Sequence, residues 1–147
     1  MKKLKLTAVT SLLLIMTGYG QSYNLRTKNQ KTMDTKEIAQ NILNTLEKGW
    51  NNGNGAEFAT PFADTSEFVD IRGTLYPSAT RQLIAEAHHG LLMSIYKDSK
   101  IVYKLVQAML IDQNTILANA STELNAPTGP LAGKNASTIT LVITKSD

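Results

Sequence analysis

The amino-acid sequence predicts an α+β domain in which three N-terminal helices pack on a curved antiparallel sheet. Up to residue 96 the apolar residues recur every three or four positions, as in amphipathic helices. From residue 100 onward they alternate with polar residues, as in strands. Helices followed by a run of strands are typical of helices covering one face of an antiparallel sheet. The 147 residues suffice for one domain with a single core.

The first twenty residues differ in kind from the rest of the chain. Three lysines precede an apolar run from Leu12 to Met16, and the small residues Gly18 and Gly20 follow it. This order is typical of a secretory signal peptide. The apolar run is shorter than the about 20 residues that a membrane-spanning helix needs. We therefore expect a signal peptide over residues 1–20, cleavage after Gly20, and a secreted or periplasmic protein without membrane contact after cleavage.

Charge and cysteine content narrow the classes of function. The formal net charge of +3 equals the three lysines of the predicted signal peptide, so the mature chain has 12 basic and 12 acidic residues. A phosphate-binding surface needs Lys and Arg clustered on one face, and no nucleic-acid partner is expected here. Because the chain has no cysteine, disulfides and thiolate metal sites are excluded.

The helices are predicted from apolar spacing. Residues 21–32 are polar and aperiodic and are expected to form a flexible leader, and the domain covers residues 33–147. The first helix is expected to begin at Asp34 and end after residue 50. Four apolar residues define its stripe at intervals of four: Ile38, Ile42, Leu46 and Trp50. A short second helix is expected over residues 56–62. A third is expected over residues 78–96, with an apolar face that contains Ile84, Ala87, Leu91 and Ile95.

Strands are predicted from alternation. Residues 66–73 form the first, with Phe68, Asp70 and Arg72 on one face. Three longer strands follow over residues 100–112, 114–126 and 137–146. A tight turn at residues 112–114 joins the first two of these, and a loop over residues 127–136 precedes the last.

The order of these segments resembles the nuclear transport factor 2-like superfamily, and most of all its SgcJ/EcaC and SnoaL-like branch. Three short motifs carry the resemblance: Trp50-Asn-Asn-Gly-Asn-Gly-Ala-Glu-Phe58, Phe62-Ala-Asp64, and Arg81-x-x-Ile84 with His88 four residues later. It implies a cone-shaped fold with an apolar pocket between helices and sheet. Members include isomerases, dehydratases, polyketide cyclases, immunity proteins and subunit-association modules, and fold alone does not decide between them.

Two departures from the family pattern stand out. Thr80 occupies the position where members usually have Gly, and the segment before it is longer than usual. Members of the family also continue, after the equivalent of residues 137–146, into a final strand that this sequence lacks. Either the natural protein ends early or the sequence is truncated, and both alternatives stay open. The strand over residues 137–146 is therefore expected to have an unpaired edge, which favours aggregation or dimerisation.

Six aromatic residues are candidates for lining the implied pocket, although ordinary core packing also explains them: Trp50, Phe58, Phe62, Phe68, Tyr76 and Tyr103. Asp70 lies between Val69 and Ile71, and a carboxylate in an apolar pocket has a raised pKa and can act as a base. The resemblance supports this placement, because isomerase members use acidic residues inside the cone. Alternatively, Asp70 forms an ion pair with Arg72 outside the pocket.

His88 and His89 are the only histidines. One residue of helix rotates the side chain by about 100°, so the two face different directions. His88 shares the stripe of Ile84, where it is either a hydrogen-bonded core residue or, at the position the family pattern favours, a general acid or a group that orients a carbonyl. Helical metal pairs need a spacing of three or four residues. We therefore expect no metal site and no cofactor.

Three functions remain open. The first is a binding protein for a small apolar or carbonyl-containing ligand. The second is a cofactor-free isomerase or dehydratase of the ketosteroid-isomerase type, with Asp70 as base and His88 or Tyr76 polarising the substrate oxygen. The third is an association module that forms a homodimer through the sheet. Pairing of Asp70 with Arg72 on the outside would contradict the second function.

Overall fold

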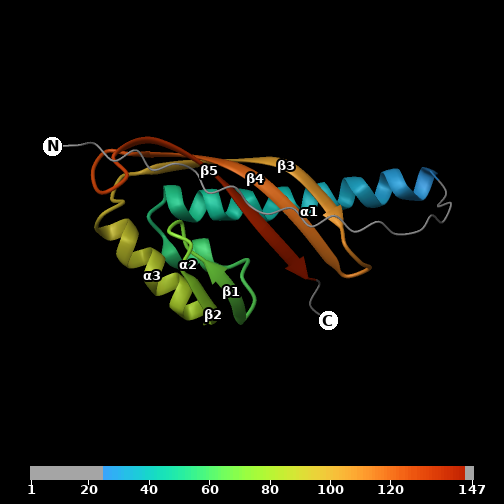
Figure 1. Cartoon of the computed structure of the whole chain (residues 1–147), viewed down its shortest axis with the longest axis horizontal. Coiled ribbons are helices and arrows are strands. Elements are labelled where there is room, and N and C mark those ends of the chain that lie inside the picture. Colours follow the sequence, from blue (N-terminus) through green and yellow to red (C-terminus); the bar gives the residue numbers. More distant parts are fainter. Residues whose placement is uncertain (1–24, 145–147) are drawn as a thin grey trace.

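The computed structural model describes residues 25–144. The predicted signal peptide and the first four residues of the predicted leader lie outside this range. Figure 1 shows a long helix lying along a three-stranded sheet, with a smaller lobe of two helices and a β-hairpin beside them. The elements in chain order are α1 (Leu25–Asn51), α2 (Gly55–Ala59), β1 (Thr65–Val69), β2 (Leu75–Thr80), α3 (Arg81–Met93), β3 (Lys100–Leu110), β4 (Thr115–Ala126) and β5 (Gly133–Thr144).

Helix α1 begins earlier than the apolar stripe indicates. It starts at Leu25, so the predicted start at Asp34 is wrong, and the predicted leader is helical from residue 25. Residues 25–48 contain neither Gly nor Pro, so no residue there breaks the helix. The buried stripe of α1 includes Ala39, Leu43 and Leu46, whereas Ile38 is 45% exposed and does not belong to it. No helix among the described residues is long and apolar enough to span a membrane.

The sheet is antiparallel, with the order β3-β4-β5, and the β1–β2 hairpin forms a separate two-stranded sheet. Strands β3 and β4 confirm the prediction to within two residues. Strand β5 begins at Gly133, four residues before the predicted start, and pairs with β4 without interruption from Gly133 to Thr144. Because β5 is an edge strand, the predicted unpaired edge is confirmed for the described part of the chain.

The opposite edge of this sheet is covered by side chains of α1. Asn51 donates from Nδ2 to the carbonyl oxygen of Ile101 at 2.9 Å and accepts from its N–H at 2.8 Å. The carboxylate of Glu47 accepts from the N–H of Tyr103 at 2.9 Å. These bonds satisfy backbone groups of β3 that have no neighbouring strand among residues 25–144.

The β1–β2 hairpin differs most from the prediction. Strand β1 ends at Val69, and Asp70 begins the turn, in which the N–H of Asp70 donates to the carbonyl of Thr74 at 3.0 Å. Residues 75–80 form β2, so the predicted helix start at residue 78 is wrong. Helix α3 starts after Thr80, whose hydroxyl accepts from the N–H of Leu83 at 3.1 Å and caps the helix.

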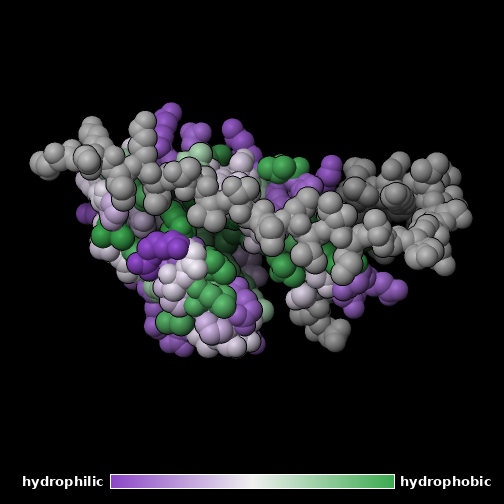
Figure 2. Space-filling model, in the orientation of Figure 1, coloured by the Kyte–Doolittle hydropathy of each residue, from purple (hydrophilic) through white to green (hydrophobic). Residues whose placement is uncertain are grey.

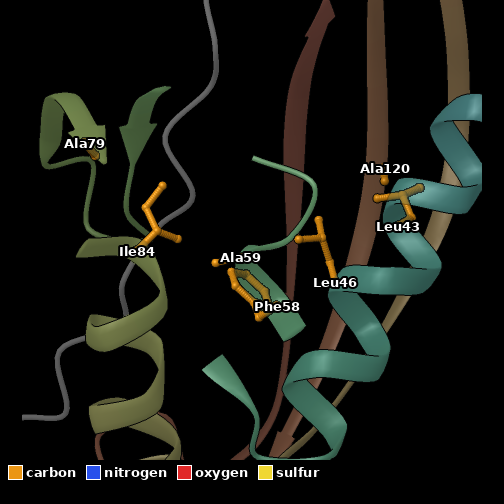
Figure 3. Close-up of a cluster of buried hydrophobic side chains, with 7 residues drawn as sticks. All are labelled: Leu43, Leu46, Phe58, Ala59, Ala79, Ile84 and Ala120. Atoms are coloured by element: carbon orange, nitrogen blue, oxygen red, sulfur yellow. The ribbon is translucent and has the colours of Figure 1, made fainter. Parts of the chain in front are cut away.

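A buried cluster joins the lobe to α1 and the sheet. Its members are Leu43, Leu46, Phe58, Ala59, Ala79, Ile84 and Ala120. Figure 3 shows Phe58 and Ala59 of α2 between Ile84 on one side and Leu46 on the other. Two glycines permit this close packing. A Cβ at Gly49 would lie 2.2 Å from the backbone nitrogen of Phe58, and one at Gly55 would lie 2.3 Å from the carbonyl oxygen of Ala85.

Candidate functional site

His88 lies in the middle of a cluster of aromatic rings. Its imidazole stacks on Phe58, with ring centroids 4.1 Å apart and an interplanar angle of 22°. Trp50 and Phe68 approach it edge-on, at 6.3 Å and 5.6 Å. These contacts connect α1, α2, β1 and α3 at one point, which is where the resemblance implies a pocket. Figure 2 shows apolar atoms gathered where the lobe meets the sheet.

The structure brings most of the predicted aromatic residues together. Phe58, Phe62, Phe68 and Tyr76 form a continuous chain, with successive ring centroids 6.0 to 6.3 Å apart. Trp50 lies 6.1 Å from Phe58. Tyr103 of β3 is half-buried and packs against the same core clusters as Trp50. Burial is the main cause that raises the pKa of the Tyr103 hydroxyl, and the negative charge of Glu47 raises it further. The hydroxyl therefore stays protonated.

One member of the aromatic cluster was not predicted. Tyr96 lies 5.7 Å from Trp50 and is buried. Its neighbour Ser99 is buried as well and accepts a hydrogen bond from the indole Nε1 of Trp50 at 3.0 Å. The third helix was expected to extend to residue 96, but α3 ends at Met93. The turn that follows rotates Tyr96 back toward the core.

Helix α3 positions His88 through a stripe with intervals of four. Ile84, His88 and Leu92 are buried, whereas Ala87 and Ile95, which were predicted on the apolar face, are exposed. The prediction that His88 belongs to the apolar stripe is confirmed. His89 is exposed and points elsewhere. Within the described residues, no group of three or more His, Cys, Asp or Glu side chains could hold a metal ion.

The protonation of His88 follows from its contacts. Nδ1 lies 2.8 Å from the carbonyl oxygen of Ile84, one helical turn earlier. Burial lowers the pKa of His88 from 6.5, and the bond to Ile84 opposes this only in part. The ring is therefore neutral at pH 7. Among the described residues, Nε2 of His88 has no hydrogen-bond partner. Every side-chain nitrogen or oxygen atom there that is fully buried does have a hydrogen-bond partner. Nε2 therefore borders accessible space.

This lowered pKa predicts a loss of stability in mild acid. Below the ordinary value of 6.5 the unfolded chain binds a proton that folded His88 does not, so the free energy of unfolding falls as the pH falls. We expect the fall between about pH 6.5 and 5, above the range in which ordinary carboxylates titrate. Urea unfolding at several pH values measures it. The fall should persist in His89→Ala and disappear in His88→Phe; an unchanged slope in His88→Phe would assign it to other groups.

Asp70 does not have the environment of a base in an apolar pocket. Its carboxylate forms an ion pair with the guanidinium of Arg72 at 2.9 Å and accepts from the N–H groups of Thr74 and Arg72, both at 2.9 Å. The bond from Thr74, followed by those from Arg72, lowers the pKa of Asp70 to about 2. The expected raised pKa is therefore wrong. Tyr76 adds a long hydroxyl contact of 3.4 Å. The carboxylate binds to its own turn because the N–H groups of Arg72 and Thr74 lie only two and four residues after Asp70.

A shallow depression on the other face of the sheet contains none of the predicted site residues. It is lined by Val102, Lys104, Ser121, Thr122, Glu123 and Ala136. Buried residues of β4 alternate with half-buried or exposed ones, and most of the lining side chains lie on the less buried face, which is turned away from α1. The aromatic cluster around His88 is therefore the better candidate site.

Comparisons with known proteins define the class of fold. No protein-family model and no curated protein matches the chain. A domain of unknown function with a cystatin-like fold from Nostoc punctiforme is 20% identical, with a TM-score of 0.68 over 79% of this chain and 71% of that one. A nuclear transport factor 2-like protein of unknown function from Shewanella oneidensis is 14% identical, with a TM-score of 0.62 over 78% and 89%.

A third similar structure contains a ligand. It is a protein with a ketosteroid-isomerase-like fold from Catenulispora acidiphila in complex with trimethylamine, 15% identical, with a TM-score of 0.51 over 71% of this chain and 75% of that one. Together the comparisons show that this chain has the cystatin-like α+β fold, which is also described as nuclear transport factor 2-like. The predicted class of helices packed on an antiparallel sheet is thereby confirmed.

Proposed function

We propose that the protein binds a small, largely apolar molecule at the aromatic cluster around His88. The observation that carries this proposal is the buried imidazole whose Nε2 has no hydrogen-bond partner among the described residues and borders accessible space. Apolar walls with a few placed polar groups are typical of small-molecule sites. The complex of the Catenulispora acidiphila protein with trimethylamine supports the idea that this fold accommodates small ligands.

The same contacts favour binding over isomerase chemistry. A proton-transfer enzyme needs a base with a pKa near the working pH, and Asp70 has a pKa of about 2 in its ion pair with Arg72. The motifs around Trp50 and His88 support assignment to the SnoaL-like branch. Residues 1–20 have the composition of an export signal, and we propose that the binding protein acts outside the cytoplasm.

Trp50 provides a direct test of this site. It is the only tryptophan, so its indole N–H gives a single signal in a ¹H–¹⁵N NMR spectrum, and its ring lies 6.3 Å from His88. Titration with small cyclic alcohols, ketones and hydrocarbons is expected to shift this signal saturably. Phe68→Ala should weaken the binding roughly tenfold, because it removes a ring from the cluster.

The neighbouring residue supplies the matched control. Val69 precedes the same turn but is 59% exposed, so Val69→Ala should leave the dissociation constant unchanged. An indole signal that no compound shifts, or equal binding by the Phe68→Ala and Val69→Ala proteins, would contradict the proposal.

A second candidate function is association through the edge of β5. The strand pairs with β4 over twelve residues without a bulge, contains no Pro, and has Lys134 as its only charged residue. Such an edge lacks the features that usually prevent pairing with another strand. The backbone of β3 is covered by Asn51 and Glu47, so within the described residues β5 is the open side of the sheet. We propose that two copies pair through it.

Lysine substitutions distinguish this mode of association from others. Val142 of β5 and Val106 of β3 have similar exposure, 65% and 67%. Val142→Lys places a charge on the open edge and should raise the dimer dissociation constant at least roughly tenfold, whereas Val106→Lys should not. Sedimentation velocity over a range of concentrations measures both. A wild-type protein that stays monomeric at high concentration, or equal effects of the two substitutions, would exclude β5 pairing.

A further inference from the structure

We infer that a ligand presents a hydrogen-bond donor, a hydroxyl or an N–H group, to Nε2 of His88. This inference rests on the proposed binding function and specifies its ligand class. It departs from the expectation, drawn from the sequence, that His88 donates a proton to a carbonyl oxygen. The reason lies in the backbone of α3, because a single carbonyl oxygen determines which ring nitrogen has the proton.

The carbonyl of Ile84 determines the tautomer. A carbonyl oxygen only accepts hydrogen bonds, so the 2.8 Å contact with Nδ1 requires a proton on Nδ1. A neutral imidazole has one N–H and one lone pair, and Nε2 is then the acceptor. Nδ1 faces the α3 backbone, so Nε2, on the other side of the ring, is directed away from that backbone. Burial of the ring disfavours the second proton that would turn Nε2 into a donor.

The surrounding rings determine what else a ligand meets. Phe58 covers one face of the imidazole, while Trp50 and Phe68 stand nearly perpendicular to it, at interplanar angles of 71° and 90°. The indole N–H of Trp50 is already bonded to Ser99. The lone pair of Nε2 is therefore the available polar group among these four rings. A matching ligand has an apolar body and one donor, and a carbonyl oxygen at the same place would face the lone pair unfavourably.

A cationic amine with an N–H would satisfy the same geometry as an alcohol. Aromatic faces attract cations, so the shared chemistry is one donor on an apolar body. The binding experiment below therefore includes both kinds of donor, with cyclohexanol as the neutral compound and N-methylpiperidinium as the cationic one. Cyclohexanone, which has nearly the size of cyclohexanol but only accepts hydrogen bonds, is the matched control.

The tautomer is measured first, on the ligand-free protein. A long-range ¹H–¹⁵N NMR spectrum distinguishes a protonated ring nitrogen from an unprotonated one, and the two histidines are told apart with His89→Ala. We expect Nδ1 of His88 to be protonated and Nε2 to be unprotonated at pH 7. A protonated Nε2 in the ligand-free protein would overturn the inference without bearing on whether ligands bind at all.

The ligand class is measured second, through the indole signal of Trp50. We expect cyclohexanol or N-methylpiperidinium to bind at least roughly tenfold more tightly than cyclohexanone. The reason is that bound cyclohexanone would bury the Nε2 acceptor without a hydrogen-bond donor. The donor should also shift the Nε2 resonance of His88. In His88→Phe the preference should disappear, and the wild-type Nε2 shift tests the inference even if this variant does not fold. Equal binding of cyclohexanone overturns the inference but sustains the proposed function, whereas failure of all three compounds to bind overturns both.

Discussion

Gly49→Ala is expected to lower the free energy of unfolding by about 2 kcal/mol or more, although alanine favours a helix over glycine by about 1 kcal/mol. The reason is contact with backbone. A Cβ on Gly49 would lie 2.2 Å from the nitrogen and 2.5 Å from the Cα of Phe58. Backbone atoms cannot rotate away as a side chain can, so α2 must move from α1. That movement would open the cluster that contains His88.

Gly90→Ala is the matched control for this substitution. Gly90 lies inside α3, and a Cβ there would meet no atom within 4 Å beyond its chain neighbours and the backbone of its own helix. The same chemical change should therefore stabilise the protein, by up to about 1 kcal/mol, through helix propensity alone. Urea unfolding of both variants measures the difference in sign. If Gly49→Ala stabilised the protein as well, the close contact between α1 and α2 would not exist in solution.

The sequence predicts the helices and strands whose apolar pattern is regular. It does not predict the elements whose limits depend on a single local contact. Strands β3 and β4 alternate over more than ten residues, and their limits are predicted to within two residues. Strand β2 is short and contains Pro77, which argues against a strand in general. It is tolerated because β2 pairs only with β1. No periodicity distinguishes such a strand from the irregular start of a helix.

The candidate site divides in the same way. Most of its aromatic residues and His88 are predictable because they lie on helical and strand stripes, although Phe62 lies between α2 and β1. The protonation state of Asp70 is not predictable, because it depends on a turn in which Thr74 and Arg72 donate four hydrogen bonds to one carboxylate. Tyr96 was not predicted as a member of the cluster for a related reason, since its direction depends on where α3 ends. The protonation of a charged residue and the end of a helix depend on single contacts. A pattern of apolar residues does not predict such contacts.

Phe58→Ala is expected to lower the free energy of unfolding by about 3 to 5 kcal/mol, the usual range for removing a buried aromatic side chain. Phe58 is 5% exposed and stacks on His88. The matched control is Leu83→Ala on α3, because Leu83 is 51% exposed and its loss should cost less than about 1 kcal/mol. Urea unfolding at pH 7 measures both variants. Equal losses would show that α2 does not pack as described.

The same substitution also tests the origin of the lowered pKa of His88. Burial is its main cause, and Phe58 covers one face of the ring. Without Phe58, water reaches the imidazole, so the pKa of His88 should rise toward 6.5. NMR titration of His88 in a folded Phe58→Ala protein measures this. Because a raised pKa lets the folded protein bind the proton as the unfolded chain does, the loss of stability between about pH 6.5 and 5 should shrink in the same variant. If the pKa of His88 rose but the loss of stability in mild acid did not shrink, or the reverse, the ionisation of His88 would not be the cause of that loss.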